Sequence, residues 1–557
     1  MSLFDVLSWN GISFLSLGYL AFLLVAVLVR YLCPKRGRAA ALLAVSWLFY
    51  CTWNPVCLVF LLVTIGSTYL TGLWLGRAPV MVDAADSIDG ATGLECAEGM
   101  KCTAGLGRAV TARENVAARK GILAGCLILN LGILFCCKYW TMFLPGILEQ
   151  TLLPVGISFY TLQALGYVID CYLGKERAEK SFVAYALFVS FFPGITSGPI
   201  ERGGNLLPQI HALSGNGRNE EDSWENLRNG ILILFWGYFL KLVLADRIAI
   251  VVNAVYSDPQ SWKGTVVVLA VLLYSIQIYC DFAGYSAIAI GSARVLGFRV
   301  MQNFTAPYLT TSIAEFWRNW HISLSTWFRD YLYIPLGGNR KGAVRKHLNL
   351  LIVFAVSGLW HGAGATYLVW GLLHGVYQVI GDLKRRALLR MHGKEEQECS
   401  PLRKRSGEKM ISHREGKGSS MSGTGGEFGR DFSGRVLRTI VVFVLVSFAW
   451  IFFRAESFSK AWEIIRCMRG VTLWQLTDGS LIKLGLDTVN WVLLACGILL
   501  LLVRDICVRR GISLRAKILR QSLWLRWILY IGVILLILVC GIWGPGYDAS
   551  TFIYSQF

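Results

Sequence analysis

Long apolar runs recur from one end of the 557-residue chain to the other, and they constrain its fold more than any other feature. A helix needs about 20 mostly apolar residues to cross the roughly 30 Å hydrocarbon core of a bilayer. Candidate runs lie near residues 12–32, 39–53, 55–76, 120–138, 154–172, 182–198, 229–256, 264–293, 348–381, 436–453, 485–503 and 523–544. The sequence therefore predicts an all-α, polytopic integral membrane protein with about 11 to 12 transmembrane helices.

Composition and charge exclude two other classes of protein. Only 16% of the residues are charged and 55% are hydrophobic, whereas about a quarter are charged in an ordinary soluble domain. The net charge is +19, but Lys and Arg gather between the apolar runs and not along one face of a helix. This distribution follows the positive-inside rule. We therefore predict a multi-pass protein of the cell membrane that contacts membrane lipids and no nucleic acid.

Basic linkers set the expected topology and domain organisation. The linkers at 34–38, 175–180 and 504–520 should face the cytoplasm, which places the tail after Trp543, with no Lys or Arg, outside. Residues 1–557 read as a single membrane domain with two polar inserts, 77–120 and 384–435. Both inserts lack the apolar residues that a core needs, so we expect disordered cytoplasmic loops there.

The segment from Ser312 to Tyr333 is too rich in charges and aromatic residues to span a membrane. Its aromatic residues recur at three- and four-residue spacing, which predicts an amphipathic helix lying in the interface or roofing a cavity on the cytoplasmic side. His321 falls at the edge of the apolar stripe, one turn from Ser325 and Arg318. The plain alternative is an interfacial His with an apolar body and a polar tip.

The run from Leu348 to Gly381 has basic residues before and after it, so both of its ends should be cytoplasmic. The stretch Gly358–Gly364 divides it into two arms of roughly 14 to 17 residues, about 21 to 25 Å long and short of a full crossing. This pattern predicts a re-entrant hairpin that places His361 inside the bilayer, where an ionisable residue indicates function.

The chemistry of His361 follows from its surroundings in the sequence. No Cys, Asp or Glu lies near it at metal-binding spacing, and His374, thirteen residues on, is not an i, i+4 partner, so we expect no metal site. A neutral imidazole tolerates burial and still accepts a proton, which suits a general base that activates a hydroxyl.

Three motifs identify a family resemblance. They are Tyr279-Cys-Asp-Phe-Ala-Gly-Tyr285, the stretch from Glu315 through Trp-His-Ile-Ser-Leu-Ser to Arg340, and Gly358-Leu-Trp-His-Gly362. With these motifs the chain resembles the membrane-bound O-acyltransferases, most closely the alginate O-acetyltransferase type. Residues 153–160, 198–200 and 552–557 extend the resemblance over most of the chain outside the polar inserts.

The resemblance implies an O-acyltransferase built as a helical bundle, with in-plane and re-entrant helices around a thinned centre. It implies that an acyl group, acetyl in the first instance, passes from a cytoplasmic donor toward an exported polysaccharide. Acetyl-CoA would be the donor, with no tightly bound cofactor, and an extracytoplasmic acyltransferase partner would complete the transfer. His361 would act as general base, and His321 would position or polarise the acyl carbonyl.

Two further candidate sites each keep an alternative. Gly337, Gly338, Asn339, Arg340 and Lys341 form a basic turn that can meet the phosphates of an acyl-CoA, or it is only a membrane-surface turn.

Tyr554, in the aromatic tail placed outside, can accept the acyl group as a covalent relay, because a phenyl ester is a better acyl donor than a sugar ester. It can equally be an interfacial anchor.

Some charged residues interrupt the apolar runs. Lys241, Asp246 and Arg247 should mark a cytoplasmic boundary, and Asp281 either resembles a family position or simply pairs with a neighbouring donor.

Two rival functions stay open at this stage. One is the transfer of D-alanyl or another acyl group to a cell-wall polymer, and the other is a polysaccharide or lipid transporter without chemistry. No internal repeat of the kind common in transporters is visible.

Overall fold

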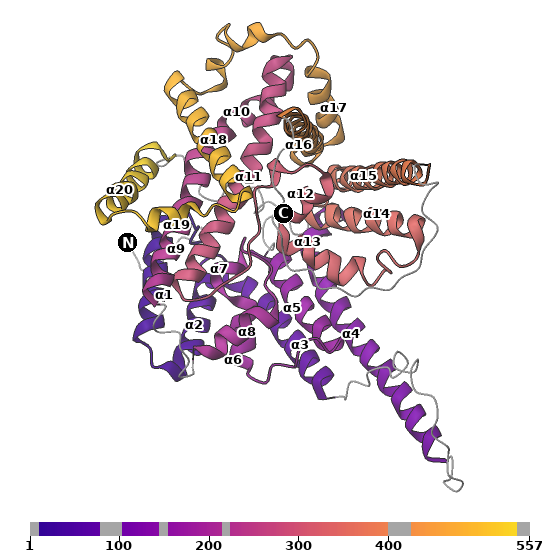
Figure 1. The fold of residues 1–557 in the computed structure, drawn as a ribbon. Coiled ribbons are helices and arrows are strands. Elements are labelled where there is room, and N and C mark those ends of the chain that lie inside the picture. Colours follow the sequence, from indigo (N-terminus) through magenta and orange to yellow (C-terminus); the bar gives the residue numbers. More distant parts are fainter. Residues whose placement is uncertain (1–10, 78–102, 144–153, 214–222, 399–424, 543–557) are drawn as a thin grey trace, which may run out of the picture.

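The computed structural model describes residues 11–77, 103–143, 154–213, 223–398 and 425–542, and within them every regular element is a helix (Figure 1). The first helices are α1 (Leu17–Leu32), α2 (Arg38–Cys51), α3 (Leu58–Arg77), α4 (Thr103–Phe143), α5 (Ile157–Tyr172), α6 (Phe182–Ser190), α7 (Phe192–Ile195) and α8 (Gly203–Ala212). The central ones are α9 (Ser223–Tyr238), α10 (Asp246–Ser257), α11 (Thr265–Val295), α12 (Ile313–Asn319), α13 (Ile322–Phe328), α14 (Gly342–His361) and α15 (Ala365–Glu398). The last are α16 (Gly425–Arg454), α17 (Phe458–Cys467), α18 (Thr488–Arg509), α19 (Leu514–Leu519) and α20 (Leu523–Cys540).

Shorter turns complete the secondary structure. Two π-helical segments occupy Phe239–Ala245 and Arg329–Tyr333. Single 3₁₀ turns lie at Lys35–Gly37, Pro55–Cys57, Pro259–Ser261, Pro307–Leu309, Leu473–Leu476 and Ile482–Leu484.

Helix α11 runs through the centre of the molecule, and most of its residues are buried (Figure 1). Helix α9 packs along it through glycines. A Cβ added to Gly237 would lie 2.8 Å from the carbonyl oxygen of Gly284, and one added to Gly230 would lie 2.8 Å from that of Gly291. Small residues let two membrane helices approach this closely without a hydrophobic driving force.

Seven helices in the described part of the chain are long and apolar enough to cross a membrane. They are Pro55–Gly76, Val116–Tyr139, Thr265–Val295, Gly342–His361, Ser433–Arg454, Thr488–Arg509 and Leu523–Cys540. The all-α, polytopic prediction is confirmed. The number of long spans is lower than the hydropathy runs suggested, because runs 12–32, 39–53, 154–172 and 182–198 fold as shorter helices. A π-helical segment also divides run 229–256 between α9 and α10. Apolar segments of 10 to 14 residues are more often buried core helices than crossings.

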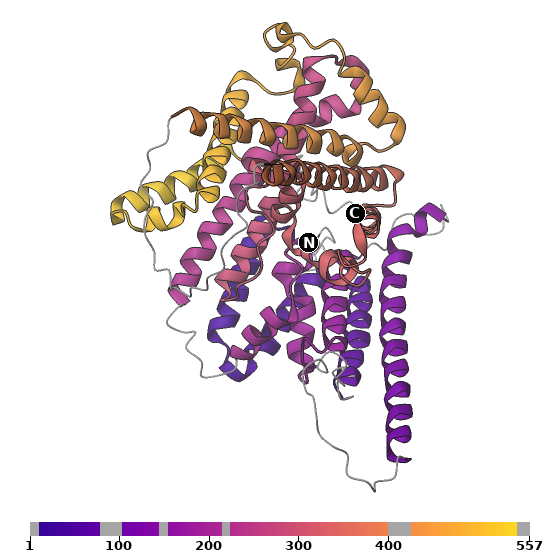
Figure 2. The same cartoon turned by 45° about the vertical axis from the view of Figure 1, so that its right-hand side comes forward.

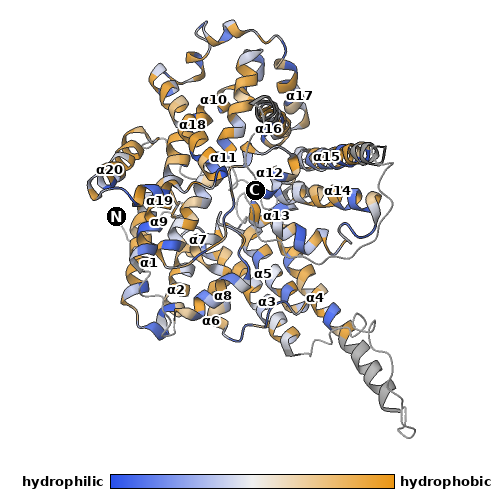
Figure 3. Cartoon of the chain, viewed as in Figure 1, coloured by the Kyte–Doolittle hydropathy of each residue, from blue (hydrophilic) through white to orange (hydrophobic). Residues whose placement is uncertain are grey.

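The outer helices are rich in apolar residues, as the orange colour of α18 and α20 shows in Figure 3. Helix α20, yellow in Figures 1 and 2, lies at the outside of the molecule in both views. Only 6% of the apolar window in α20 is buried inside the protein. Trp524 and Val539 of this helix are 82% and 78% exposed. Such surfaces suit the acyl chains of a bilayer, which agrees with the multi-pass membrane location.

The two polar inserts are partly helical in the described residues. Helix α4 begins at Thr103, so residues 103–120 are helical, while 78–102 lie outside the described residues. Helix α15 continues to Glu398 and α16 begins at Gly425, so only 399–424 of the second insert lie outside the described residues. Residues 384–398 are rich in Lys, Arg, Leu and Glu, which are good helix formers and let the preceding helix continue.

The charges predicted to mark a cytoplasmic boundary are buried inside the protein. Lys241 lies in the first π-helical segment and is 2% exposed. Its ammonium lies 2.7 Å from a carboxylate oxygen of Asp246 and 2.6 Å from one of Asp281. Buried charges persist when they pair with one another, so Asp281 does have a neighbouring donor. Arg247 donates to the carbonyl of Cys540, 2.7 Å away.

Candidate active site

The segment from Ser312 to Tyr333 is not the single helix that its spacing predicts. It breaks at Trp320–His321 into α12 and α13, and α13 continues into the second π-helical segment. His321 adopts φ 42° and ψ 55°, in the left-handed region, which is uncommon for a residue other than glycine. The break turns the imidazole inward, so His321 is 1% exposed and not at the edge of an interfacial stripe.

Asn303 holds this turn in place, and sequence reasoning missed it. The backbone carbonyl of Asn303 accepts a hydrogen bond from the backbone N–H of Ile322 at 3.0 Å. Its side-chain oxygen accepts one from the Ser323 hydroxyl at 2.6 Å, and its amide donates to the Ser286 hydroxyl at 3.0 Å. Strained backbone persists where the surrounding structure over-determines it. No spacing rule connects a loop Asn with a His 18 positions later, so only the fold reveals this contact.

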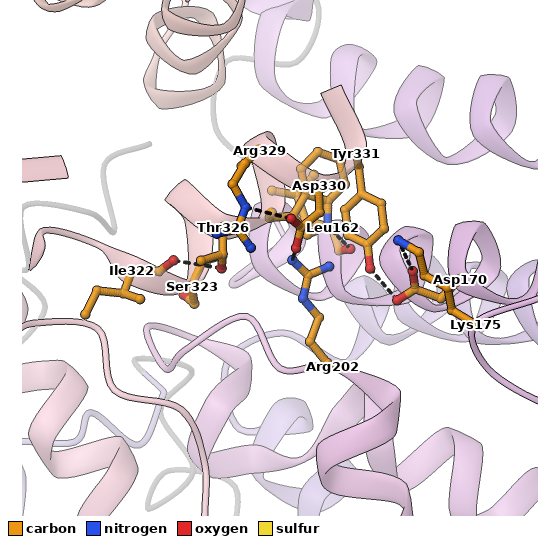
Figure 4. A network of polar contacts seen from close by, with 11 residues as sticks. Leu162, Asp170, Lys175, Arg202, Ile322, Ser323, Thr326, Arg329, Asp330 and Tyr331 are labelled. Atoms are coloured by element: carbon orange, nitrogen blue, oxygen red, sulfur yellow. Dashed lines mark hydrogen bonds and ion pairs between the residues drawn. The ribbon is translucent and has the colours of Figure 1, made fainter. Parts of the chain in front are cut away.

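Polar contacts fix the rest of the segment against α5 and a neighbouring loop (Figure 4). The indole N–H of Trp327 donates to the carbonyl of Leu162 at 2.8 Å. The Tyr331 hydroxyl donates to the Asp170 carboxylate, and Arg202 forms an ion pair with Asp330 at 3.3 Å. These contacts anchor the segment to α5 and to the loop that carries Arg202.

The predicted break in the apolar run from Leu348 to Gly381 is present. Helix α14 ends at His361 and α15 begins at Ala365, and the two helices lie side by side (Figure 1). The prediction of short arms is wrong for α14, which has 20 residues and so extends about 30 Å, enough for a crossing. Helix α14 is longer than the predicted arm because it starts at Gly342 and so includes Arg345 and Lys346, the basic residues that precede the apolar run. A Cβ on Gly358 would lie 2.4 Å from the carbonyl oxygen of Tyr367, so this hairpin packs closely.

The fold brings His321 and His361 together. Their ring centroids are 6.5 Å apart, and His361 is 2% exposed. Burial lowers the pKa of His321 to about 3, so its imidazole is neutral near pH 7 and carries one N–H donor.

Aromatic rings surround the pair. Trp360, Trp370 and Phe453 lie 4.8, 5.0 and 5.4 Å from the ring of His361. Phe282 lies 4.6 Å from that of His321. The sequence pointed to each histidine separately, and the structure supplies their proximity.

His374 is a third buried histidine close to this pair. It is 0% exposed, and its Nδ1 accepts a hydrogen bond from the indole N–H of Trp317 at 3.2 Å. Its ring lies 5.3 Å from that of Trp370, which also contacts His361. Trp317 belongs to α12, so this bond ties α12 to α15. Among the described residues no group of three or more His, Cys, Asp or Glu side chains is arranged to hold a metal.

The predicted phosphate-binding turn, Gly337–Lys341, lies apart from the histidine pair. Gly337 and Gly338 have φ of 106° and 52°, values that glycine adopts without strain. Arg340 and Lys341 are exposed. This turn precedes α14, whereas His361 ends it, so the two sites are separated by about the 30 Å length of that helix. Tyr554 lies outside the described residues.

Comparison with known proteins decides the family. The chain is 32% identical over 463 residues to the probable alginate O-acetylase AlgI of Pseudomonas aeruginosa. The aligned region covers 82% of this chain and 74% of that protein. Residues 175–395 also match the profile of MBOAT, the membrane-bound O-acyltransferase family.

The chain belongs to the membrane-bound O-acyltransferase family. It is therefore a multi-pass membrane O-acyltransferase, and the interpretation as a transporter without chemistry loses its support. The peptidoglycan O-acetyltransferase of Helicobacter pylori is 30% identical over 392 residues, 64% of this chain and 66% of that protein. The teichoic acid D-alanyltransferase of Bacillus subtilis is 26% identical over 274 residues, 46% of this chain and 66% of that protein.

Proposed function

We propose that this membrane-bound O-acyltransferase takes an acetyl group from acetyl-CoA at the cytoplasmic face and delivers it toward an exported polysaccharide. The observation that carries the proposal is the pair His321–His361, two buried polar rings 6.5 Å apart within aromatic walls. The names of the alginate and peptidoglycan relatives support acetyl as the acyl group and a polymer as the acceptor.

In the proposed reaction His361 is the general base. It accepts the proton of the acceptor hydroxyl while that oxygen attacks the acyl carbonyl of the thioester. His321, which is neutral, donates its N–H to the carbonyl oxygen and stabilises the negative charge that develops there. The carbon–sulfur bond then breaks, the thiolate leaves, and protonated His361 returns the proton to the sulfur. The products are an ester and free thiol.

The turn Gly337–Lys341 suits the far end of an extended donor. Its exposed cations Arg340 and Lys341 offer positive charge, and its glycines let backbone N–H groups approach a phosphate. Its distance from His361 means that it would hold the nucleotide part and take no part in the chemistry.

Tyr554 is proposed as the first acceptor, which receives the acyl group and passes it to an extracytoplasmic acyltransferase partner. The support is chemical and comes from the sequence: a phenol loses its proton more easily than a sugar hydroxyl. Tyr554→Phe removes only the hydroxyl, so a relay should fail with no acyl-tyrosine in the C-terminal peptide by mass spectrometry. Normal glycan acylation by this variant would leave Tyr554 as an anchor.

The central test is His361→Ala, measured as transfer from labelled acetyl-CoA and as O-acetyl groups on surface polysaccharide. Loss of a general base should slow transfer by roughly 10² to 10⁴. The matched control is His211→Ala, because the His211 side chain is 53% exposed and pairs only with Glu179 among the contacts described. A variant at position 361 that is made at normal levels and acetylates at the wild-type rate would overturn the assignment.

A second candidate, D-alanyl transfer to a cell-wall polymer, is favoured by the likeness to teichoic acid D-alanyltransferase. Supplying labelled acetyl and labelled D-alanyl donors side by side distinguishes the two, since the polymer should carry only one label.

A further inference from the structure

Helix α4 brings a cation to the break that carries His361. The ammonium of Lys138 donates to the carbonyl of Trp360, and the hydroxyl of the adjacent Tyr139 donates to the carbonyl of Leu359. The same ammonium lies 5.5 Å from the centre of the Trp360 ring. Trp360 directly precedes His361 in the last turn of α14. Lys138 is therefore held beside the proposed general base by residues 222 positions away in the chain.

The charge of Lys138 has no counter-ion in the described part of the chain. No Asp or Glu there lies within ion-pair distance of its ammonium, and its contacts are a carbonyl and an indole ring. Lys241 differs, because two carboxylates pair with it. An ionisable side chain in a membrane segment is costly and usually functional. Burial without a carboxylate favours the neutral amine of a lysine, so an anion that develops beside Lys138 would stabilise its protonated, charged form.

Helix capping is the simpler explanation of the contact between Lys138 and Trp360, and it must be distinguished from a role of the Lys138 charge in the reaction. Lysine and arginine side chains often bind the last carbonyls of a helix. Arg119, in the middle part of α4, does so for two helices, donating to the carbonyls of Leu75 at 2.8 Å and Tyr172 at 3.1 Å. At the end of α14, however, Tyr139 already binds the preceding carbonyl without a charge. Lys138 adds a positive charge that capping does not require.

We propose that Lys138 is a further catalytic residue, whose ammonium faces the acyl carbonyl oxygen as that oxygen becomes negative. The inference rests on the proposed function, in which His361 activates the attacking hydroxyl. Lys138 transfers no proton. Its charge stabilises the tetrahedral oxyanion until the carbon–sulfur bond breaks, and the leaving thiolate then takes its proton from His361. A fixed charge of this kind is worth more in a water-poor site than in water.

Three variants of the full-length protein separate charge from capping. Lys138→Gln keeps an N–H donor for the Trp360 carbonyl and loses the charge, whereas Lys138→Met loses both. Tyr139→Phe, the matched control, loses a cap at the neighbouring carbonyl and no charge. For a charge role, Gln and Met should both lower kcat by about 10² to 10³ with little change in KM, and Tyr139→Phe should stay near the wild-type rate.

The opposite pattern overturns the proposal. If Lys138→Gln works like the wild type while Lys138→Met is slow, the residue only caps α14. Equal losses in Lys138→Gln and Tyr139→Phe would also reduce Lys138 to a helix cap. If Lys138→Met does not accumulate as folded protein, Lys138→Gln still decides by comparison with Tyr139→Phe, because it loses the charge and keeps the donor.

A double variant separates the proposed role of Lys138 from the proposed function on which it rests. If Lys138 acts on the step that His361 initiates, Lys138→Gln should add little to the loss already caused by His361→Ala, because residues that act as a unit are non-additive. Fully additive losses would show that Lys138 acts elsewhere. Wild-type activity in His361→Ala alone would refute the base assignment, and the Lys138 variants would still report whether a charge is needed.

Discussion

Gly371 sets the spacing between α14 and α15, and replacing it with Ala tests whether that spacing controls the histidine pair. The added Cβ would lie 2.2 Å from the carbonyl oxygen of Phe354 and 3.2 Å from the Cα of Gly358, both on α14. A carbon–oxygen contact normally needs about 3.3 Å. The two helices must therefore separate by about 1 Å at this point, because backbone atoms cannot rotate away as a side chain can. Overpacking of this kind costs about 1 to 3 kcal/mol of stability.

The displacement reaches the active site because α14 carries His361 at its end, whereas Asn303 fixes the turn of His321 separately. A misplacement of about 1 Å can cost roughly 10²-fold in rate. We therefore expect Gly371→Ala to lower acetyl transfer by about that factor, measured per mole of folded protein in membranes.

The matched control is Gly381→Ala on the same helix. Nothing lies within 4 Å of the Cβ that it would add. Its activity should be unchanged, and its thermal midpoint should stay the same or rise, since Ala is favoured over Gly in a helix by about 1 kcal/mol. Equal activity and equal thermal midpoints in the two variants would refute the argument from helix spacing.

Further predictions concern the packing around the site and the second insert. Lys241→Met should lower the free energy of unfolding by about 3 to 5 kcal/mol, because it leaves two carboxylates buried without their cation; a thermal midpoint equal to that of the wild type would contradict the buried triad. His374→Phe leaves the indole N–H of Trp317 without an acceptor, at a cost of about 1 to 3 kcal/mol, and the double variant with Trp317→Phe should recover part of this loss in a thermal-shift assay. Purely additive losses would argue against that hydrogen bond. Replacing residues 399–424 with a short Gly-Ser linker should leave acetyl transfer within about twofold, since the segment lacks the apolar residues needed to fold; a large loss at normal expression would assign it a binding role.

Local sequence patterns determined the class of the fold and the position of its main break. Hydropathy marks a membrane protein without reference to tertiary contacts, because the bilayer itself selects for apolar runs. The Gly-rich stretch with His361 inside a run bounded by basic residues was enough to locate the break, and Gly362–Gly364 does separate α14 from α15. Hydropathy could not separate a short buried helix such as α6 from a crossing, because both are apolar throughout.

The tertiary structure alone decided which side chains meet. Helical spacing predicted one continuous helix through His321, but contacts with Asn303 stabilise a left-handed turn there and direct the ring inward. The burial of Lys241 with two carboxylates and the placement of Lys138 beside Trp360 are likewise invisible to any local pattern. The physical reason is that periodicity and hydropathy describe each segment by itself, whereas the partner of a charge or a ring depends on how helices distant in the chain pack together.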